Sequence, residues 1–206
     1  NIMAELFARS QALKPLAERM RPRQFSEMVG QARLLAQDAV FRTAIEAGHI
    51  HSMILWGPPG CGKTTLALLI AQYAKARYVS ISAVLSGLPE VRKVLAEAEQ
   101  YFQNGEKTVL FVDEVHRFNK IQQDAFLPFI EKGSIIFIGA TTENPSFELN
   151  SALLSRCRVH VLENVSTVDI ILAMKAALNH GTLGIMTPVI IHDVHLHDIA
   201  HAADGD

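Results

Sequence analysis

The residue types best suited to chemistry lie in a glycine-rich stretch between an apolar run, Met53–Trp56, and a helical run, Leu66–Ala71. Glycines in such a loop let successive backbone N–H groups turn inward around phosphate oxygens, and the helix that follows adds the positive end of its dipole. Lys63 then reaches the β- and γ-phosphates, and the hydroxyl of Thr64 is placed to ligate Mg²⁺. The stretch predicts a phosphate-binding loop, the Walker A motif, with ATP and Mg²⁺ as ligands. Its residues are Gly57, Pro58, Pro59, Gly60, Cys61, Gly62, Lys63, Thr64 and Thr65.

Two adjacent carboxylates follow a second apolar run, Val109–Val112. A buried strand of this kind delivers Asp113 to the Mg²⁺ shell at its carboxyl end, whereas Glu114 orients or deprotonates the attacking water. A lone Asp-Glu pair after a strand is usually a solvated acidic turn. Beside a phosphate loop the pair is a Walker B pattern, which predicts an ATPase that releases ADP and phosphate.

Short apolar runs alternate with longer helical stretches, as is typical of a parallel sheet covered by helices. The pattern predicts an α/β fold, a five-stranded parallel sheet with helices on both faces. The expected strands are Ser52–Trp56, Tyr78–Ile81, Thr108–Val112, Ser134–Gly139 and Val159–Leu162. The expected helices are Arg33–Ala47, Thr64–Lys75, Pro89–Phe102, Ile121–Glu131 and Ala152–Arg156.

The character of the chain changes after Glu163. Ser166–Leu178 is an amphipathic helical stretch, a loop with glycine and proline follows, and His192–Ala203 is helical again. We expect residues 1–164 to form a nucleotide-binding core with an N-terminal linker, and residues 165–206 to form a partial helical lid.

Composition narrows the class of protein. The chain has 206 residues, 49% hydrophobic and 19% charged, with a formal net charge of −2. This balance predicts a folded protein, and composition alone does not indicate nucleic-acid binding. The longest apolar runs are far shorter than the roughly 18 residues needed to cross a bilayer, so we expect no membrane segment. The first residues lack the pattern of a signal peptide, which favours a cytoplasmic protein.

Cysteine and histidine raise two smaller questions. Cys61 and Cys157 are too few for a disulfide framework. Because Cys61 lies beside Lys63 and a helix N-terminus, we expect its thiol pKa to be lowered and Cys61 to be the more reactive cysteine. His192, His195, His197 and His201 could hold a metal, but no cysteine accompanies them, and the pattern favours a solvated helix face.

The basic residues also have two interpretations. Arg19, Arg21 and Arg23 form one cluster, and Arg117 with Lys120 forms another. Either cluster could meet a phosphate backbone, and either could be ordinary solubilising charge.

A helicase is an alternative to weigh. Residues 113–116 fit the DExH motif, and residues 140–142 imitate the later Ser-Ala-Thr motif of such enzymes. These helicases need a second ATP-binding lobe of similar size, and residues 165–206 are too few to form one.

Several stretches resemble AAA+ ATPases of the clamp-loader group, and more closely the replication-associated recombination protein A family, which includes the eukaryotic Werner helicase-interacting ATPase. They are residues 15–22, 29–31, 51–60, 111–120, 139–150 and 155–157. The resemblance runs from Pro15 to Asp206 and is most distinctive over residues 116–128 and 141–156. It implies a P-loop AAA+ core and a homo-oligomer when full length.

The resemblance also implies roles for single residues. Val29 and Gly30 would form the linker that packs on adenine. Thr141 would be the first sensor, whose hydroxyl bonds the γ-phosphate or the lytic water. Arg156, in a Ser-Arg-Cys motif, would be the arginine finger that reaches the ATP of a neighbouring subunit. Cys61 replaces the threonine usual in the family, and its position should contribute only a backbone N–H.

As a whole, the resemblance implies the ATPase module of a replication-fork maintenance and recombination factor acting on DNA forks, ends or single-strand/duplex junctions. Single-strand-binding protein and replisome components are possible partners, and a nucleoid-associated location, or a nuclear one in a eukaryote, would follow. The family pattern continues into an arginine-bearing second sensor, so we expect these residues to be an N-terminal fragment that is monomeric alone. A clamp-loader or Holliday-junction motor subunit, and an ATP-gated scaffold with negligible hydrolysis, remain alternatives.

Overall fold

The computed structural model describes residues 14–180, 184–185 and 191–203, so the first residues of the chain lie outside the described part. The chain forms two compact units, residues 31–164 and residues 1–30 together with 165–206. One division between the units falls between residues 164 and 165. Within the smaller unit, Arg19 Nη1 donates to the Gly184 carbonyl at 3.1 Å, and Gly30 packs against Val165.

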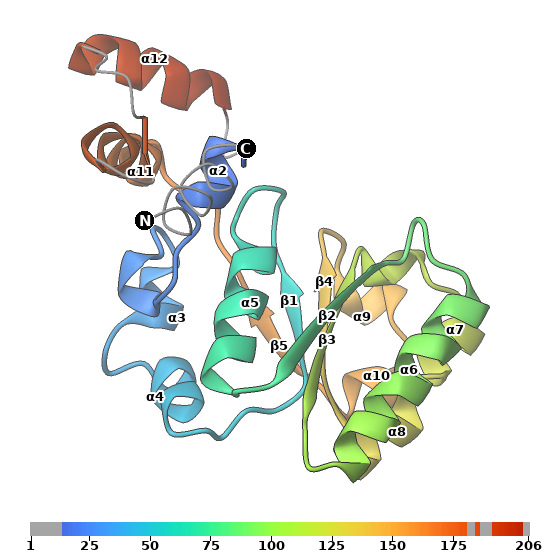
Figure 1. The fold of residues 1–206 in the computed structure, drawn as a ribbon. Helices are drawn as coiled ribbons and strands as arrows, with labels where there is room; N and C mark the ends of the chain where they lie inside the picture. Colours follow the sequence, from blue (N-terminus) through green and yellow to red (C-terminus); the bar gives the residue numbers. More distant parts are fainter. Residues whose placement is uncertain (1–13, 181–183, 186–190, 204–206) are drawn as a thin grey trace. The chain divides into compact units, whose positions relative to one another are not determined.

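The larger unit is built on a sheet of five parallel strands in the order β2-β3-β4-β1-β5 (Figure 1). This confirms the predicted fold class. The observed strands differ from the expected ranges by one or two residues at their ends. They are β1 (Met53–Trp56), β2 (Arg77–Ser82), β3 (Thr108–Asp113), β4 (Ile135–Thr141) and β5 (Arg158–Val161).

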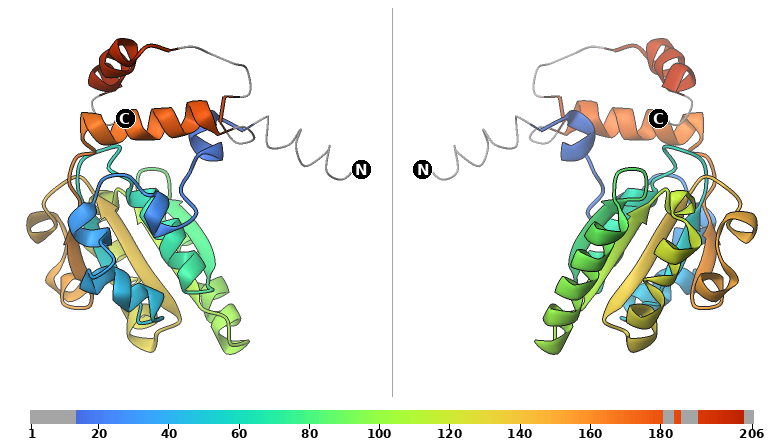
Figure 2. Two further views of the ribbon diagram at one scale, coloured as in Figure 1. Left: turned by 90° about the vertical axis from the view of Figure 1, so that its left-hand side faces the viewer. Right: turned by 90° about the vertical axis from the view of Figure 1, so that its right-hand side faces the viewer.

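Helices cover both faces of this sheet. The crossover from β1 to β2 runs along the sheet in one direction, and those from β2 to β3 and from β3 to β4 run in the other. Because parallel crossovers are right-handed, α5 (Lys63–Tyr73) packs on one face, and α6 (Leu88–Gln103) and α8 (Leu127–Lys132) pack on the opposite one. The three views agree on this arrangement (Figures 1 and 2).

The core of the larger unit lies on the two central strands. Every residue of β4 is buried, and β3 is buried up to Asp113. This explains why both strands read as nearly continuous apolar runs. On the face covered by α6 and α8, Leu110 and Phe137 pack with Leu95 and Phe126. Packed layers of sheet and helix therefore hold the carboxyl ends of β3 and β4.

The expected helix Arg33–Ala47 is wrong, since the structure has two shorter helices, α3 (Ala32–Leu35) and α4 (Val40–Glu46). Both bury residues against the unit, Leu35 in α3, and Phe41 and Ile45 in α4. On one continuous helix Leu35 would point well away from the other two, because six residues do not complete whole turns. A turn over residues 36–39 lets all three be buried.

The expected helix Ile121–Glu131 is likewise divided, into α7 (Lys120–Asp124) and α8. The cause is Pro128, which lacks an N–H and whose ring would clash with the carbonyl of Asp124 in a continuous helix. Pro128 instead lies in the first turn of α8, where a missing N–H costs nothing.

The remaining elements are short or belong to the smaller unit. In the larger unit they are the 3-10 helix η2 (Val115–Arg117), α9 (Pro145–Glu148) and α10 (Ser151–Leu154). The smaller unit contains α2 (Leu16–Arg19), the 3-10 helix η1 (Phe25–Glu27), α11 (Thr167–Asn179) and α12 (Asp193–Ala203). Helices α11 and α12 share a small apolar cluster around Ile171 and Leu196. Within the described ranges, no helix combines the length and apolar character that crossing a membrane requires.

Candidate active site

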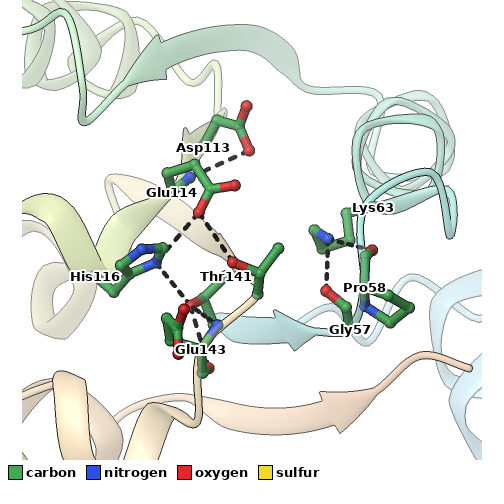
Figure 3. A network of polar contacts seen from close by, with 9 residues as sticks. Gly57, Pro58, Lys63, Asp113, Glu114, His116, Thr141 and Glu143 are labelled. Atoms are coloured by element: carbon green, nitrogen blue, oxygen red, sulfur yellow. Dashed lines mark hydrogen bonds and ion pairs between the residues drawn. The ribbon is translucent and has the colours of Figure 1, made fainter. Parts of the chain in front are cut away.

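Three neighbouring strands bring the predicted phosphate site together. In the order β3-β4-β1 all strands are parallel, so their carboxyl ends share one edge of the sheet. The phosphate loop follows β1, Glu114 follows β3, and Thr141 ends β4 (Figure 3). The Gly57 N–H donates to the Thr141 carbonyl at 3.1 Å, which joins the loop directly to the end of β4.

The backbone of the phosphate loop explains its glycines. Gly62 has a φ of 95° immediately before α5, a left-handed conformation that side chains with a Cβ disfavour. A Cβ on Gly57 would lie 2.7 Å from the Leu162 carbonyl oxygen and 3.0 Å from Cys61 Sγ. Close packing therefore leaves no room for a side chain at position 57, and the loop leads directly into the N-terminus of α5.

Lys63 places a positive charge inside this loop. The residue is only 9% exposed, and its Nζ donates to the carbonyls of Gly57 at 2.8 Å and Pro58 at 2.7 Å. Carbonyl dipoles satisfy the ammonium group but do not neutralise it. An anion held by the loop would offset the cost of burying this charge.

The two carboxylates after β3 are separated by an unusual backbone turn. Glu114 has a φ of 51°, and its N–H donates to Asp113 Oδ1 at 3.1 Å. A left-handed non-glycine residue stores strain, and such strain concentrates at functional sites. The Glu114 carboxylate lies beside His116, whose Nδ1 is 3.2 Å from Oε2 (Figure 3), and Thr142 Oγ1 is 3.5 Å from the same oxygen.

Asp113 and Thr64 fit the predicted role of Mg²⁺ ligands. Thr64 is exposed in the first turn of α5, and among the described residues nothing bonds to Asp113 Oδ2. Both groups offer hard oxygen donors, which Mg²⁺ prefers, and two protein ligands are the usual number at a nucleotide site. The chemistry of the donor set therefore suits this ion.

The predicted sensor, Thr141, is completely buried and lies in a polar cluster. Its Oγ1 lies 2.9 Å from His116 Nδ1, accepts from the Glu143 N–H at 3.0 Å and donates to the Glu143 carbonyl at 3.2 Å. The Glu114 Oε2 atom lies 3.2 Å from the same His116 nitrogen. Sequence analysis missed His116 as part of the site, although the DExH pattern had marked its position.

Arg156 is engaged elsewhere in its own chain. It follows α10, and its Nε and Nη2 lie 2.7 and 2.5 Å from Glu131 Oε1. Its Nη1 also donates to the Ala152 carbonyl at 2.7 Å. The structure therefore does not bring Arg156 to the phosphate loop of the same chain, and its role as an arginine finger stays a prediction.

Val29 and Gly30 belong to the smaller unit, and their predicted packing on adenine also stays a prediction. The next residue, Gln31, lies in the larger unit and is 6% exposed. Its Nε2 donates to the carbonyls of Glu163 at 2.6 Å and Cys61 at 3.3 Å, and its Oε1 accepts from the Glu163 N–H at 3.0 Å. Gln31 thus fastens the phosphate loop to the end of β5.

Gln31 also lines a cavity of about 420 Å³ beside the loop, with Arg33, Leu34, Val161 and Glu163. Sequence analysis assigned no role to Gln31. The signal that could have found it is its place directly after Gly30, at the start of the core.

The expected lowering of the thiol pKa of Cys61 is wrong. Cys61 is buried, and this burial raises the pKa of its thiol more than Lys63, at 3.9 Å, lowers it. Burial also raises the pKa of Cys157, to about 12. The electropositive loop does not compensate for the loss of solvent, so Cys61 does not have an activated thiol.

The histidine-rich segment forms α12, in which Asp193 pairs with Lys175 at 2.9 Å. Among the described residues, no group of three or more His, Cys, Asp or Glu side chains is placed to hold a metal ion.

Comparison with known proteins gives one family. Residues 53–165 match the ATPase family associated with various cellular activities (AAA). Over 94% of its length the chain is 56% identical to the replication-associated recombination protein A of Escherichia coli strain K12. It is 43% identical over 96% of its length to the ATPase WRNIP1 of Dictyostelium discoideum.

The structural similarity is broader. The RuvB Holliday junction branch migration motor of Thermotoga maritima superposes on 88% of this chain with a TM-score of 0.70 and 28% identity, over 59% of its own length. The chain spans 43% of the Escherichia coli relative and 23% of the Dictyostelium relative.

Proposed function

The chain belongs to the AAA family of ATPases, and we propose that it binds ATP with Mg²⁺ and hydrolyses it to ADP and phosphate. The observation that carries the proposal is the shared edge of the sheet. There the Lys63 ammonium lies inside the phosphate loop, Glu114 follows β3, and Thr141 ends the neighbouring β4. The left-handed backbone at Glu114, which places a carboxylate at this edge, supports hydrolysis in addition to binding.

Each group has one task in the proposed reaction. The N–H groups of residues 57–65 and Lys63 hold the phosphates, and Thr64 with Asp113 holds the ion. When bound there, Mg²⁺ would neutralise charge that develops on the phosphates. Glu114 orients the attacking water and accepts its proton, while Thr141 contributes a hydroxyl close to the γ-phosphate. This division is the proposal for the catalytic residues.

We infer that Arg156 acts on the ATP of a neighbouring subunit. In its own chain it is paired with Glu131, and a guanidinium supplied from outside stabilises charge in the transition state. The adenosine part of the nucleotide is assigned to the cavity beside Gln31, with Val29 and Gly30 as the adjoining linker. Residues 165–206 are assigned to a partial lid.

For the whole protein we propose a factor in replication-fork maintenance and recombination that acts on DNA as a homo-oligomer. The 56% identity to replication-associated recombination protein A supports this assignment. Single-strand-binding protein and replisome components belong to the same proposal as partners. The similarity to the RuvB motor favours a second candidate, a subunit that moves Holliday junctions.

The experiment is a multiple-turnover ATPase assay on the full-length protein, without DNA and with forked DNA, a Holliday junction or a sliding clamp. Lys63→Ala is the control for contaminating ATPases. Stimulation by forks or single-strand/duplex junctions supports the main proposal, and stimulation by Holliday junctions alone supports the second. A response to the sliding clamp alone would indicate a clamp loader, and ATP binding without turnover would indicate a scaffold.

A further inference from the structure

We propose that His116 is a positioning residue for ATP hydrolysis, whose Nδ1–H holds the Glu114 carboxylate and the Thr141 hydroxyl in fixed relation to each other. The inference rests on the proposed function, because it concerns the same site. It goes beyond that function by assigning the hydrolytic geometry to a residue that touches neither the phosphates nor the ion.

One imidazole nitrogen makes both contacts. His116 Nδ1 lies 3.2 Å from Glu114 Oε2 and 2.9 Å from Thr141 Oγ1 (Figure 3). Its side chain is only 7% exposed, so water does not compete strongly for this nitrogen. Thr142 Oγ1 lies 3.5 Å from the same carboxylate oxygen, a longer and weaker contact. Among the described residues, the contacts of His116 with Glu114 and Thr141 are thus shorter than the direct contact between Thr142 and Glu114.

Counting protons assigns the tautomer. A carboxylate only accepts hydrogen bonds and would repel a bare Nδ1 lone pair 3.2 Å away, so the close approach of Glu114 favours a proton on His116 Nδ1. The lone pairs of the Thr141 hydroxyl accept from the Glu143 N–H and from His116, and its one proton goes to the Glu143 carbonyl at 3.2 Å, a long bond that the proton can exchange for a bond to a bound phosphate. In this assignment His116 Nδ1–H donates to Thr141 Oγ1, and its positive end attracts the Glu114 carboxylate 3.2 Å away.

These contacts explain how His116 positions Glu114 and Thr141. Glu114 adopts a left-handed backbone conformation, and its flexible side chain is anchored at one oxygen by His116. Its other oxygen, Oε1, is left for water. Because Thr141 is held by the same proton donor, the base and the sensor cannot drift apart independently. Positioning of this kind matters, since displacement of a reacting group by about 1 Å can cost on the order of 100-fold in rate.

The geometry supplies a matched pair of substitutions. The amide nitrogen of asparagine stands the same number of bonds from the backbone as imidazole Nδ1, so His116→Asn retains a donor at the required place. The amide nitrogen of glutamine stands where Nε2 is, one bond further out, so His116→Gln removes it. Both variants are neutral, polar and able to form hydrogen bonds, which separates donor position from simple polarity.

The test measures ATP hydrolysis by the full-length wild-type protein and by the Ala, Gln and Asn variants at His116, with His49→Ala as a control at an exposed histidine. We expect His116→Ala and His116→Gln to lower kcat by about 10- to 100-fold, with ATP affinity within about threefold of wild type. His116→Asn should recover most of kcat. A purely structural histidine would instead show its effect in the thermal midpoint and in ATP affinity, which are measured on the same samples.

A second measurement does not depend on activity. Long-range ¹H–¹⁵N NMR of the wild-type chain should show the Nδ1–H tautomer at His116, and an Nε2–H tautomer would overturn the inference. So would an active wild-type protein with full kcat in His116→Ala, or equal loss in the Asn and Gln variants. An inactive wild-type protein would overturn the proposed function and this inference together, whereas the other results overturn the inference alone.

Discussion

Replacing Glu131 by glutamine should increase the ATPase rate of the assembled protein. In its own chain Arg156 forms a forked contact with Glu131 Oε1, and the side chains are 34% and 54% exposed. An arginine that is proposed to act on the ATP of a neighbouring subunit must leave this contact first. Glu131→Gln keeps the shape of the side chain and removes the charge that holds the arginine.

The solvent exposure of the Arg156–Glu131 ion pair determines how large a change in kcat we expect. Exposed ion pairs contribute about 0.2–1 kcal/mol, and about 1.36 kcal/mol corresponds to tenfold, so release of Arg156 should raise kcat by about 1.4- to 5-fold. The unfolding free energy should fall by no more than about 1 kcal/mol for the same reason. The gain cannot be larger, because the bond from Arg156 to the Ala152 carbonyl remains.

The assay is steady-state ATP hydrolysis by the full-length protein at saturating ATP, with assembly checked by light scattering. Lys132→Gln is the matched control, because it breaks a different ion pair, with Glu99, from the same helix. A double variant, Glu131→Gln with Arg156→Ala, should show no gain over Arg156→Ala. A Glu131→Gln rate at or below wild type in intact assemblies would refute the reasoning.

Three further predictions concern the stability and chemistry of the larger unit. Burial lowers the pKa of His160, whose Nε2 lies 3.4 Å from His51 Nε2, from 6.5 to about 4. Between these pH values the unfolded chain binds more protons than the folded chain, so the unfolding free energy should fall as the pH drops from 6.5 to 4. Urea titrations should show a flatter pH profile for His160→Gln. Gly57→Ala should lower ATP affinity by at least about tenfold and destabilise the fold by about 1–3 kcal/mol, because the added Cβ would meet the Leu162 carbonyl. Fluorescent-nucleotide binding measures the affinity, and denaturant titration measures the stability. Maleimide should label Cys61 slowly in the folded chain at neutral pH and much faster in urea, and mass spectrometry can follow the labelling. Fast labelling of Cys61 in the folded chain would contradict the burial of its thiol.

The sheet and the phosphate loop were predictable because their signals are local. An apolar run such as Ile135–Ala140 has to be a buried strand, and a glycine loop between strand and helix suits few ligands other than phosphate. Asp113 and Glu114 followed from the same reasoning, since they end such a strand. Local signals do not predict where a helix is divided. Helical spacing does not indicate that the chain must turn after Leu35 so that Leu35 is buried in the core.

The contacts that complete the site depend on residues far apart in the sequence. His116 contacts Thr141 because β3 and β4 are neighbours in the sheet. The spacing of residues along the sequence does not predict the order of the strands in the sheet. The pairing of Arg156 with Glu131 depends likewise on how two short helices pack. For Cys61, charge and burial act in opposite directions, and only the packed structure shows that burial prevails.

The division of labour between binding and hydrolysis is tested most directly by one variant, Glu114→Gln. In the full-length protein we expect its ATP dissociation constant, measured with a fluorescent nucleotide, to stay within about threefold of wild type, while single-turnover hydrolysis slows by about 10²- to 10⁴-fold, as loss of a general base would cause. Unchanged hydrolysis, or a loss of ATP affinity as large as that of Lys63→Ala, would contradict the account.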